Sequence, residues 1–287
     1  MIGFFNKVFQ QAFGWEDSTM KFQPIGGGCI NNAYKLSTSR GDYFIKCNRD
    51  QPQMFEVEYR GLQLLSQSGC LGVPTPHRYG VQEGMGYLLM EYVEPGRMDG
   101  GFWEQLGRGL ACLHKVTSSH FGLDHDNYIG SLPQKNDFHD GWVDFFVNCR
   151  LLPQVELARN SGLITAGLVG QFEALYTKLP DLMPEEPPAL LHGDLWSGNI
   201  HSDVQSTPHV IDPAVYYGHR EAELAFTTLF GGFGDAFYKS YRDEFPLAPG
   251  FDERVGLFNL YPLLVHVNLF GASYLTGIVN TLKRFAS

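Results

Sequence analysis

Basic residues are scarce in this 287-residue chain, which contains 21 Lys and Arg against 31 Asp and Glu and has a formal net charge of −10. A protein that binds nucleic acid through its phosphate backbone needs a basic surface. The composition therefore argues against nucleic acid as a partner. It is still compatible with a small anionic ligand, because a few local cations and backbone N–H groups are enough to bind one.

Cysteines at the spacing of a metal site or a redox motif are absent as well. The cysteines are odd in number and scattered, with no CxxC pair; they are Cys29, Cys47, Cys70, Cys112 and Cys149. This pattern argues against a disulfide framework and a cysteine zinc site, and it is typical of a reducing compartment. We therefore expect a cytoplasmic protein.

A continuous apolar run long enough to cross a membrane is missing. The most apolar late segment, residues 257–279, is interrupted by Asn259, Pro262, His266 and Asn268. A membrane span needs about 20 mostly apolar residues, so a buried helix is the better interpretation. The N-terminal residues have neither the apolar core nor the cleavage site of a signal peptide. We expect no membrane partner.

What is present is the composition of a globular protein, with 44% hydrophobic and 18% charged residues. Alternating segments predict strands between residues 20 and 50 and again at 77–82 and 85–93, with a helix over 53–68. Further helical patterns follow near 101–118, 139–160, 164–179, 219–230, 234–244 and 252–284. This order predicts an α+β fold with two lobes, a β-rich one over residues 1–94 and a mostly helical one over 95–287. Clefts between lobes are common ligand sites.

Three consecutive glycines, Gly26, Gly27 and Gly28, lie at the bend of two predicted strands. Glycines let a backbone approach a ligand closely and direct N–H groups at phosphate oxygens. The alternative is a flexible hairpin tip. The chain has no GxxxxGK[ST] loop, and strands rather than a helix flank the glycines, so neither a Walker loop nor a dinucleotide fingerprint is present.

A lysine on the next strand, Lys46, follows Ile45 and precedes Cys47, so alternation places it on the face opposite to both. Most lysines on a sheet face are simply solvated. A lysine that neutralises phosphate charge would need a carboxylate to hold it, and the following helix offers Glu56 and Glu58.

Asp194 and Asn199 lie in the stretch LLHGDLWSGNI, and Asp212 ends the short apolar run HVID. In phosphoryl transfer a carboxylate can accept the proton of the attacking hydroxyl, while amide and carboxylate oxygens hold Mg²⁺. Each acid alone is more often a turn or cap residue. The ordered set of glycine hairpin, strand lysine, helix glutamate, Asp-x4-Asn loop and strand-end aspartate is much harder to explain by chance.

These blocks resemble the kinase-like phosphotransferases, and HGDLWSGN resembles their small-molecule branch, which has HGD where protein kinases have HRD. The match narrows to the fructosamine/ketosamine-3-kinase family. Its blocks here are GGGCINNAY, FEVEYRGLQLL, NYIGSLPQKN, LLHGDLWSGNI, IDPAVYYGHREAELA and the tail from FGGFGDAFYKSY to NLFG, spread from about residue 20 to 280.

The resemblance implies a two-lobed kinase-like fold with ATP in the cleft. The glycines would cover the phosphates, and Lys46 would contact them, held by Glu58, which lies three residues before Gly61 as in the ExxGL pattern of the family. The hinge that meets adenine would be Met90, Glu91 and Tyr92.

The resemblance also implies that Asp194 is the catalytic base and that Asn199 and Asp212 bind Mg²⁺. The reaction would phosphorylate the 3-hydroxyl of the sugar in a ketosamine, a fructosamine or ribulosamine, as a step in deglycation. The substrate would be a small-molecule or protein-attached ketoamine, and the protein a monomer or homodimer. Alternatives are a kinase for another hydroxyl acceptor, such as an aminoglycoside or choline, and a non-catalytic nucleotide-binding protein.

Four further residues are candidates with weaker support. Trp196, His219 and Glu223 could contact the sugar, although a carboxylate in the first turn of a helix is favoured by the helix dipole alone. Cys29 lies inside the glycine loop and is either a small loop residue or a thiol whose oxidation blocks ATP.

Overall fold

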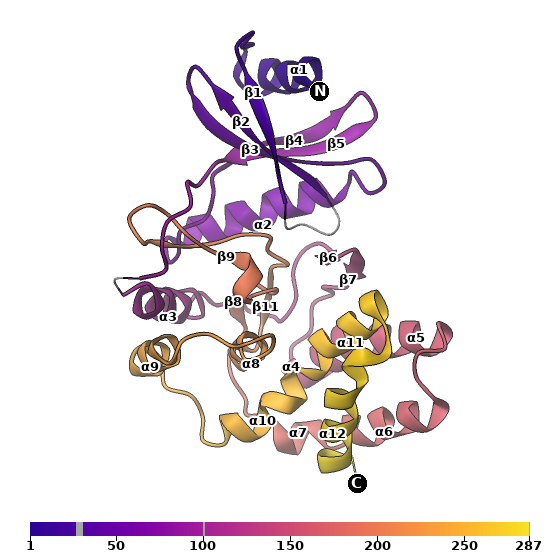
Figure 1. Cartoon of the computed structure of the whole chain (residues 1–287). Coiled ribbons are helices and arrows are strands. Elements are labelled where there is room, and N and C mark those ends of the chain that lie inside the picture. Colours follow the sequence, from indigo (N-terminus) through magenta and orange to yellow (C-terminus); the bar gives the residue numbers. More distant parts are fainter. Residues whose placement is uncertain (27–30, 100, 287) are drawn as a thin grey trace. The chain divides into compact units, whose positions relative to one another are not determined.

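The computed structural model describes residues 1–26, 31–99 and 101–286 (Figure 1). The chain divides into two compact units, Met1–Phe102 with His201–Pro213, and Trp103–Ile200 with Ala214–Ser287. Relative to the expected ranges 1–94 and 95–287, the first unit also takes in residues 95–102 and a segment that returns from the second half of the chain.

The first unit is built on an antiparallel sheet with the strand order β1-β2-β3-β5-β4. The strands are β1 (Lys21–Ile25), β2 (Asn32–Thr38), β3 (Gly41–Asn48), β4 (Pro76–Gln82) and β5 (Met85–Glu91), and helix α2 covers Met54–Ser68. The predicted strands and the predicted helix over 53–68 are confirmed.

Two helices cover the two faces of this sheet (Figure 1). Along β5, Tyr87 and Leu89 belong to the apolar cluster under helix α1 (Ile2–Phe13), whereas Leu88 and Met90 belong to the cluster under α2. This alternation is what a strand buried on both sides requires. The prediction had no α1, although its buried residues, Phe4, Phe5, Val8 and Phe9, have the spacing of one helix face.

The returning segment forms a small hairpin in the first unit. Strand β9 (Ile200–Ser202) pairs with β10 (Pro208–Val210), and His209 of β10 also pairs with Gly72. The strand predicted to end at Asp212 ends at Val210 instead. Asp212 lies just beyond it with φ 56°, a conformation that ends a strand.

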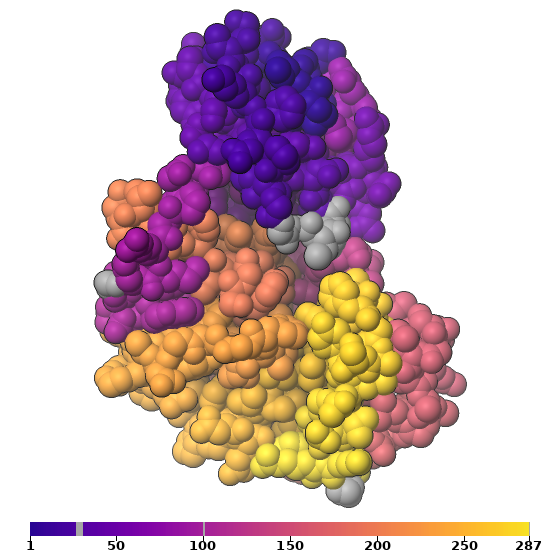
Figure 2. Space-filling view, viewed as in Figure 1, coloured from indigo at the N-terminus to yellow at the C-terminus, as the bar shows by residue number. Residues whose placement is uncertain are grey.

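The second unit is mostly helical, and its C-terminal part, yellow in Figure 2, forms part of the exposed surface. Its helices are α3 (Phe102–Leu113), α4 (Trp142–Phe145), α5 (Leu152–Asn160), α6 (Ala166–Tyr176), α7 (Leu179–Leu182), α8 (Arg220–Thr227), α9 (Asp235–Glu244), α10 (Phe251–Phe258), α11 (Leu260–Phe270) and α12 (Leu275–Phe285). Its hairpins pair β6 (Asn127–Ile129) with β7 (Leu132–Gln134), and β8 (Ala189–Leu191) with β11 (Tyr216–Gly218).

Two predicted helices are interrupted. The helix expected over 139–160 contains a π-helical stretch, Phe146–Leu151, between α4 and α5. The one expected over 252–284 is divided into α10, α11 and α12, with a break at Asn259 and another at Gly271, where φ is 95°. Within the described ranges, no helix is both long enough and apolar enough to cross a membrane.

The cysteines differ in state. Cys47 and Cys149 are free and buried. Cys70 and Cys112 are in the disulfide-bonded form, so the expectation from spacing is wrong for these two. Spacing along the chain does not decide which thiols are oxidised.

Candidate active site

Lys46 is a buried cation held by two carboxylates within the first unit. Ile45 and Cys47 pack into the cluster under α1, so Lys46 projects from the opposite face of β3, as alternation predicts. Its ammonium contacts Glu58 of α2 at 2.6 Å and also pairs with Asp212. Glu56 instead pairs with Arg60 at 2.5 Å on the surface.

Lys46 and the two carboxylates beside it each favour the charged form of the other. Burial alone would lower the pKa of Lys46, but Asp212 and Glu58 outweigh it and raise the pKa, so the ammonium stays charged. Burial also raises the pKa of Glu58, and Lys46 opposes that shift. Lys46 is therefore a cation fixed in place between two acids, which suits the neutralisation of a bound phosphate.

Asp212 is the partner that reaches Lys46 from the hairpin segment. Its side chain is 46% exposed, and its left-handed φ is tolerated by aspartate better than by most residues. Its oxygens are of the type that Mg²⁺ prefers.

Asp194 and Asn199 lie together in one loop of the second unit. The loop follows β8 and turns at Gly193, where φ is 84°. Asn199 ends a short 3-10 helix, Ser197–Asn199, and its amide nitrogen donates to the Asp194 carbonyl oxygen at 2.8 Å and to its carboxylate at 2.9 Å. Because that nitrogen donates to Asp194, the Oδ1 atom of Asn199 is the one suited to a metal ion.

Two candidates for substrate contact are held inside the second unit. His219 is 0% exposed, and it accepts from the Glu221 backbone N–H at the start of α8 and donates to the carbonyl oxygen of Pro184 at 3.1 Å. Burial lowers its pKa. Glu223 is 3% exposed and accepts hydrogen bonds from backbone N–H groups of the Asp194 loop. These positions favour structural roles for both.

Trp196 is the partly exposed candidate. Its ring makes an edge contact with Phe230 at 6.1 Å between centroids. Phe230 is 39% exposed and has the unusual φ of 55° for a non-glycine residue. Trp196 thus offers an accessible aromatic surface in the same loop as Asp194.

The structure describes only some of the residues predicted to bind the nucleotide. Gly26 is exposed, whereas Gly27, Gly28 and Cys29 lie outside the described residues. Met90 is buried under α2 and the Glu91 carboxylate accepts from Thr75.

Tyr92 follows β5, and its ring lies under the ammonium of Lys35 at 4.1 Å. Met90 and Glu91 are the last two residues of β5, and Tyr92 comes directly after them.

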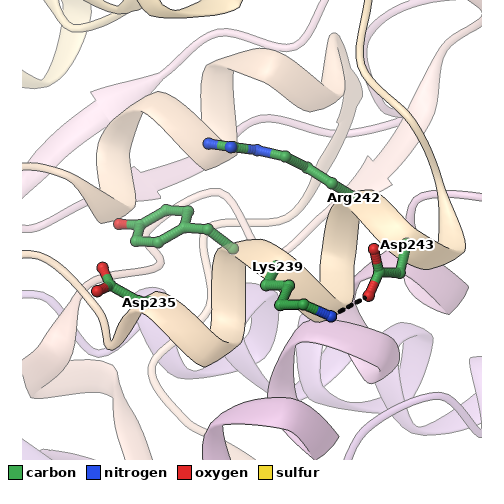
Figure 3. A pocket seen from close by; sticks show the side chains of 5 residues that line it. Asp235, Lys239, Arg242 and Asp243 are labelled. Carbon is green, nitrogen blue, oxygen red and sulfur yellow. Dashed lines mark hydrogen bonds and ion pairs between the residues drawn. The ribbon is translucent and has the colours of Figure 1, made fainter.

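A separate surface pocket lies along α9 and is lined by Asp235, Tyr238, Lys239, Arg242 and Asp243 (Figure 3). Lys239 and Asp243 pair with each other across one helical turn at 2.8 Å. The predicted site residues are not among those that line it, so we assign no ligand to it.

Sequence reasoning missed two residues close to the loop of Asp194, His114 and Tyr241. Both are buried, and His114 contacts Glu223 at 3.0 Å. The sequence carries no signal for them, since a lone His at the end of a helix and a Tyr on a helix face are common core residues.

The fold is that of the kinase-like phosphotransferases. The crystal structure of aminoglycoside phosphotransferase APH(4)-Ia matches with a TM-score of 0.65 at 16% sequence identity and covers 100% of both chains. The predicted two-lobed kinase-like α+β fold is confirmed.

The chain belongs to the fructosamine kinase family, whose model, described as "Fructosamine kinase", matches residues 1–287. It is therefore a kinase with a hydroxyl acceptor, and the prediction of a ketosamine kinase is confirmed.

Among its relatives, a "Probable ketoamine kinase" of Synechocystis sp. is 41% identical over 264 residues, which is 91% of this chain and 88% of the relative. A "Protein-ribulosamine 3-kinase, chloroplastic" of Arabidopsis thaliana is 39% identical over 274 residues, 92% of this chain and 82% of the relative. The crystal structure of a "putative fructosamine-3-kinase" from Thermobifida fusca has a TM-score of 0.88 at 34% identity and covers 98% of this chain and 97% of its own.

Proposed function

We propose that this protein uses ATP to phosphorylate the 3-hydroxyl of the sugar in a ketosamine, a fructosamine or a ribulosamine. The observation that carries the proposal is the Asp194 loop, in which Asn199 holds the carboxylate of an HGD motif at 2.9 Å, in a chain of the fructosamine kinase family.

The residues divide the reaction between them. Asp194 accepts the proton of the attacking hydroxyl as its oxygen forms a bond to the γ-phosphorus of ATP. The bond from that phosphorus to the oxygen of ADP breaks, and ADP leaves. Lys46, fixed by Glu58 and Asp212, neutralises charge on the phosphates. Two assignments stay predictions: that Gly26, Gly27 and Gly28 cover the phosphates, and that Met90, Glu91 and Tyr92 meet adenine.

Asn199 and Asp212 are the residues proposed to hold Mg²⁺, because they offer an amide and a carboxylate oxygen. A bound Mg²⁺ would neutralise further charge on the phosphates. Trp196 stays our candidate for contact with the sugar, because it is accessible and aromatic. For His219 and Glu223 we propose positions in the scaffold.

The cytoplasmic location, the monomeric or homodimeric state and a redox role of Cys29 stay predictions. The location rests on the odd number and scatter of the cysteines, two of which, Cys70 and Cys112, are disulfide-bonded, and one relative is named as chloroplastic. The expected absence of nucleic acid and membrane partners rests on the acidic composition and on the interrupted apolar segments.

The test is ADP release with Mg-ATP against a fructosyl-amine, a ribulosyl-amine, an aminoglycoside and choline. We expect activity with one or both ketoamines and little with the other acceptors. Activity with choline or the aminoglycoside alone would contradict the proposal, and so would ATP binding without turnover on any acceptor.

A further inference from the structure

A buried series of hydrogen bonds, from Tyr241 through His114 to Glu223, leads to the loop of Asp194; we call it the hydrogen-bond chain. Glu223 of α8 accepts from the backbone N–H of His192 at 3.0 Å and of Gly193 at 2.6 Å. His114, which follows α3, contacts the same carboxylate through Nε2 at 3.0 Å. Tyr241 of α9 contacts Nδ1 of His114 through its hydroxyl at 2.8 Å.

The carboxylate at the centre of the hydrogen-bond chain is ionised. Burial alone would raise the pKa of Glu223, but the hydrogen bond from His114, the nearby charges of His114 and His192 and the backbone N–H of Gly193 lower it. Because an ionised carboxylate can only accept, Nε2 of His114 is the donor in this contact. Tyr241 then fixes the orientation of the imidazole ring.

The hydrogen-bond chain is buried. Its residues are at most 3% exposed; they are Glu223, His114, Tyr241 and His192. A buried carboxylate is tolerated when all of its partners are in place. Loss of one partner should therefore disturb the others, and the disturbance can reach the loop.

The hydrogen-bond chain ends at Gly193, in a turn whose backbone conformation is tightly restricted. Gly193 has φ 84°, and a side chain there would overlap the carbonyl oxygen of Ala214. The next residue is Asp194, so the hydrogen bonds that Glu223 accepts hold the backbone directly before it. Catalytic groups lose much of their effect when they are displaced by about 1 Å.

We propose that His114 and Tyr241 are positioning residues of the phosphoryl transfer, which act on Asp194 through the Glu223 carboxylate. This inference rests on the proposed function of Asp194 as the base. It assigns a catalytic consequence to two residues that are buried in the core.

The first test compares Tyr241→Phe with Tyr238→Phe. Tyr238 lies on the same helix, and its hydroxyl contacts Thr227 at 3.1 Å and the backbone N–H of Phe233 at 3.3 Å, outside the hydrogen-bond chain. We expect Tyr241→Phe to lower kcat about threefold to tenfold, the effect of one lost hydrogen bond, with KM for ATP unchanged. Tyr238→Phe should change kcat less than about twofold.

The second test combines Tyr241→Phe with Glu223→Gln. If Tyr241 acts through Glu223, its effect on kcat disappears once the carboxylate has become an amide, because interacting residues are not additive. Effects that multiply in the double variant would overturn the inference. So would a Tyr241→Phe protein that is less stable but has the kcat of the wild type at equal folded fraction.

A third pair of variants covers the case in which Glu223→Gln does not fold. His114→Gln keeps an N–H donor near the position of Nε2, whereas His114→Leu removes it. We expect His114→Gln to retain several times more kcat than His114→Leu, and equal values would contradict the inference. A wild type that phosphorylates no ketosamine would instead refute the proposed function itself.

Discussion

At the residue scale, two largely buried cations of the described residues, Lys46 and Arg254, are paired with carboxylates. Lys46 lies between Glu58 and Asp212, and in the second unit Arg254 pairs with the fully buried Glu221 at 2.7 Å. Removing one member of such a pair leaves a charge buried alone, which is costly. The functional charges are therefore also parts of the fold.

The first prediction concerns Lys46→Met. The variant leaves Glu58 without its cation and takes the positive charge from the phosphates, so kcat/KM for ATP should fall about 100-fold or more. Lys7→Met, which breaks the exposed pair of Lys7 with Glu83, should leave kcat/KM nearly unchanged. Steady-state kinetics with varied ATP measures both, and similar values for the two variants would refute the role of Lys46.

The second prediction concerns the thiol of Cys47. Burial raises its pKa to about 12, so the folded protein should not be alkylated at this position by iodoacetamide at pH 8, whereas the denatured protein should be. The folded state holds this proton at a pH where the unfolded state releases it. The free energy of unfolding should therefore fall as pH rises from about 9 toward 12, and less so in Cys47→Ala. Mass spectrometry of the native protein after iodoacetamide treatment measures this, and alkylation of Cys47 in the folded state would contradict the prediction.

At the scale of elements, glycines serve different purposes in different turns. Gly193 turns the chain after β8 with φ 84°, and a Cβ there would overlap Ala214. Gly69 ends α2 with φ 65°, but a Cβ there would have open space.

We predict that Gly193→Ala lowers kcat more than about 100-fold, because the Asp194 loop must move. Gly69→Ala should keep its kcat and cost about 1 kcal/mol of stability; a Gly193→Ala enzyme with normal kcat would show that the turn is dispensable.

Helix α1 is the element that closes one face of the first sheet. Phe9 is 0% exposed, and its ring lies 5.0 Å from those of Trp15 and Tyr43. We predict that Phe9→Ala lowers the free energy of unfolding by about 3–5 kcal/mol, as expected for a buried aromatic residue. Val81→Ala, at a position that is 59% exposed, should cost well below about 1 kcal/mol in the same urea titration. A small loss in Phe9→Ala would mean that α1 is not part of the core.

At the scale of the whole molecule, the sequence predicted those strands and helices whose apolar residues recur with a clear period, and those site residues that lie at a fixed spacing within one motif. The alternation around Lys46 predicted the face on which it lies, and the HGD motif placed Asp194 and Asn199 in one loop. Three-residue strands such as β6 and β8 are too short to produce a recognisable alternation. The hydrogen-bond chain from Glu223 to His114 joins residues 109 positions apart, and only packing brings such residues together.

The central claim is that Asp194 serves as the base for phosphorylation of the 3-hydroxyl of a ketosamine sugar. The most direct measurement is ³¹P NMR of a fructosyl-amine or ribulosyl-amine incubated with Mg-ATP and either the wild type or Asp194→Asn. The account predicts a phosphate ester on the third carbon with the wild type and, for the variant, no ester despite retained ATP binding. An ester at another carbon, or the same ester from Asp194→Asn at a comparable rate, would contradict it.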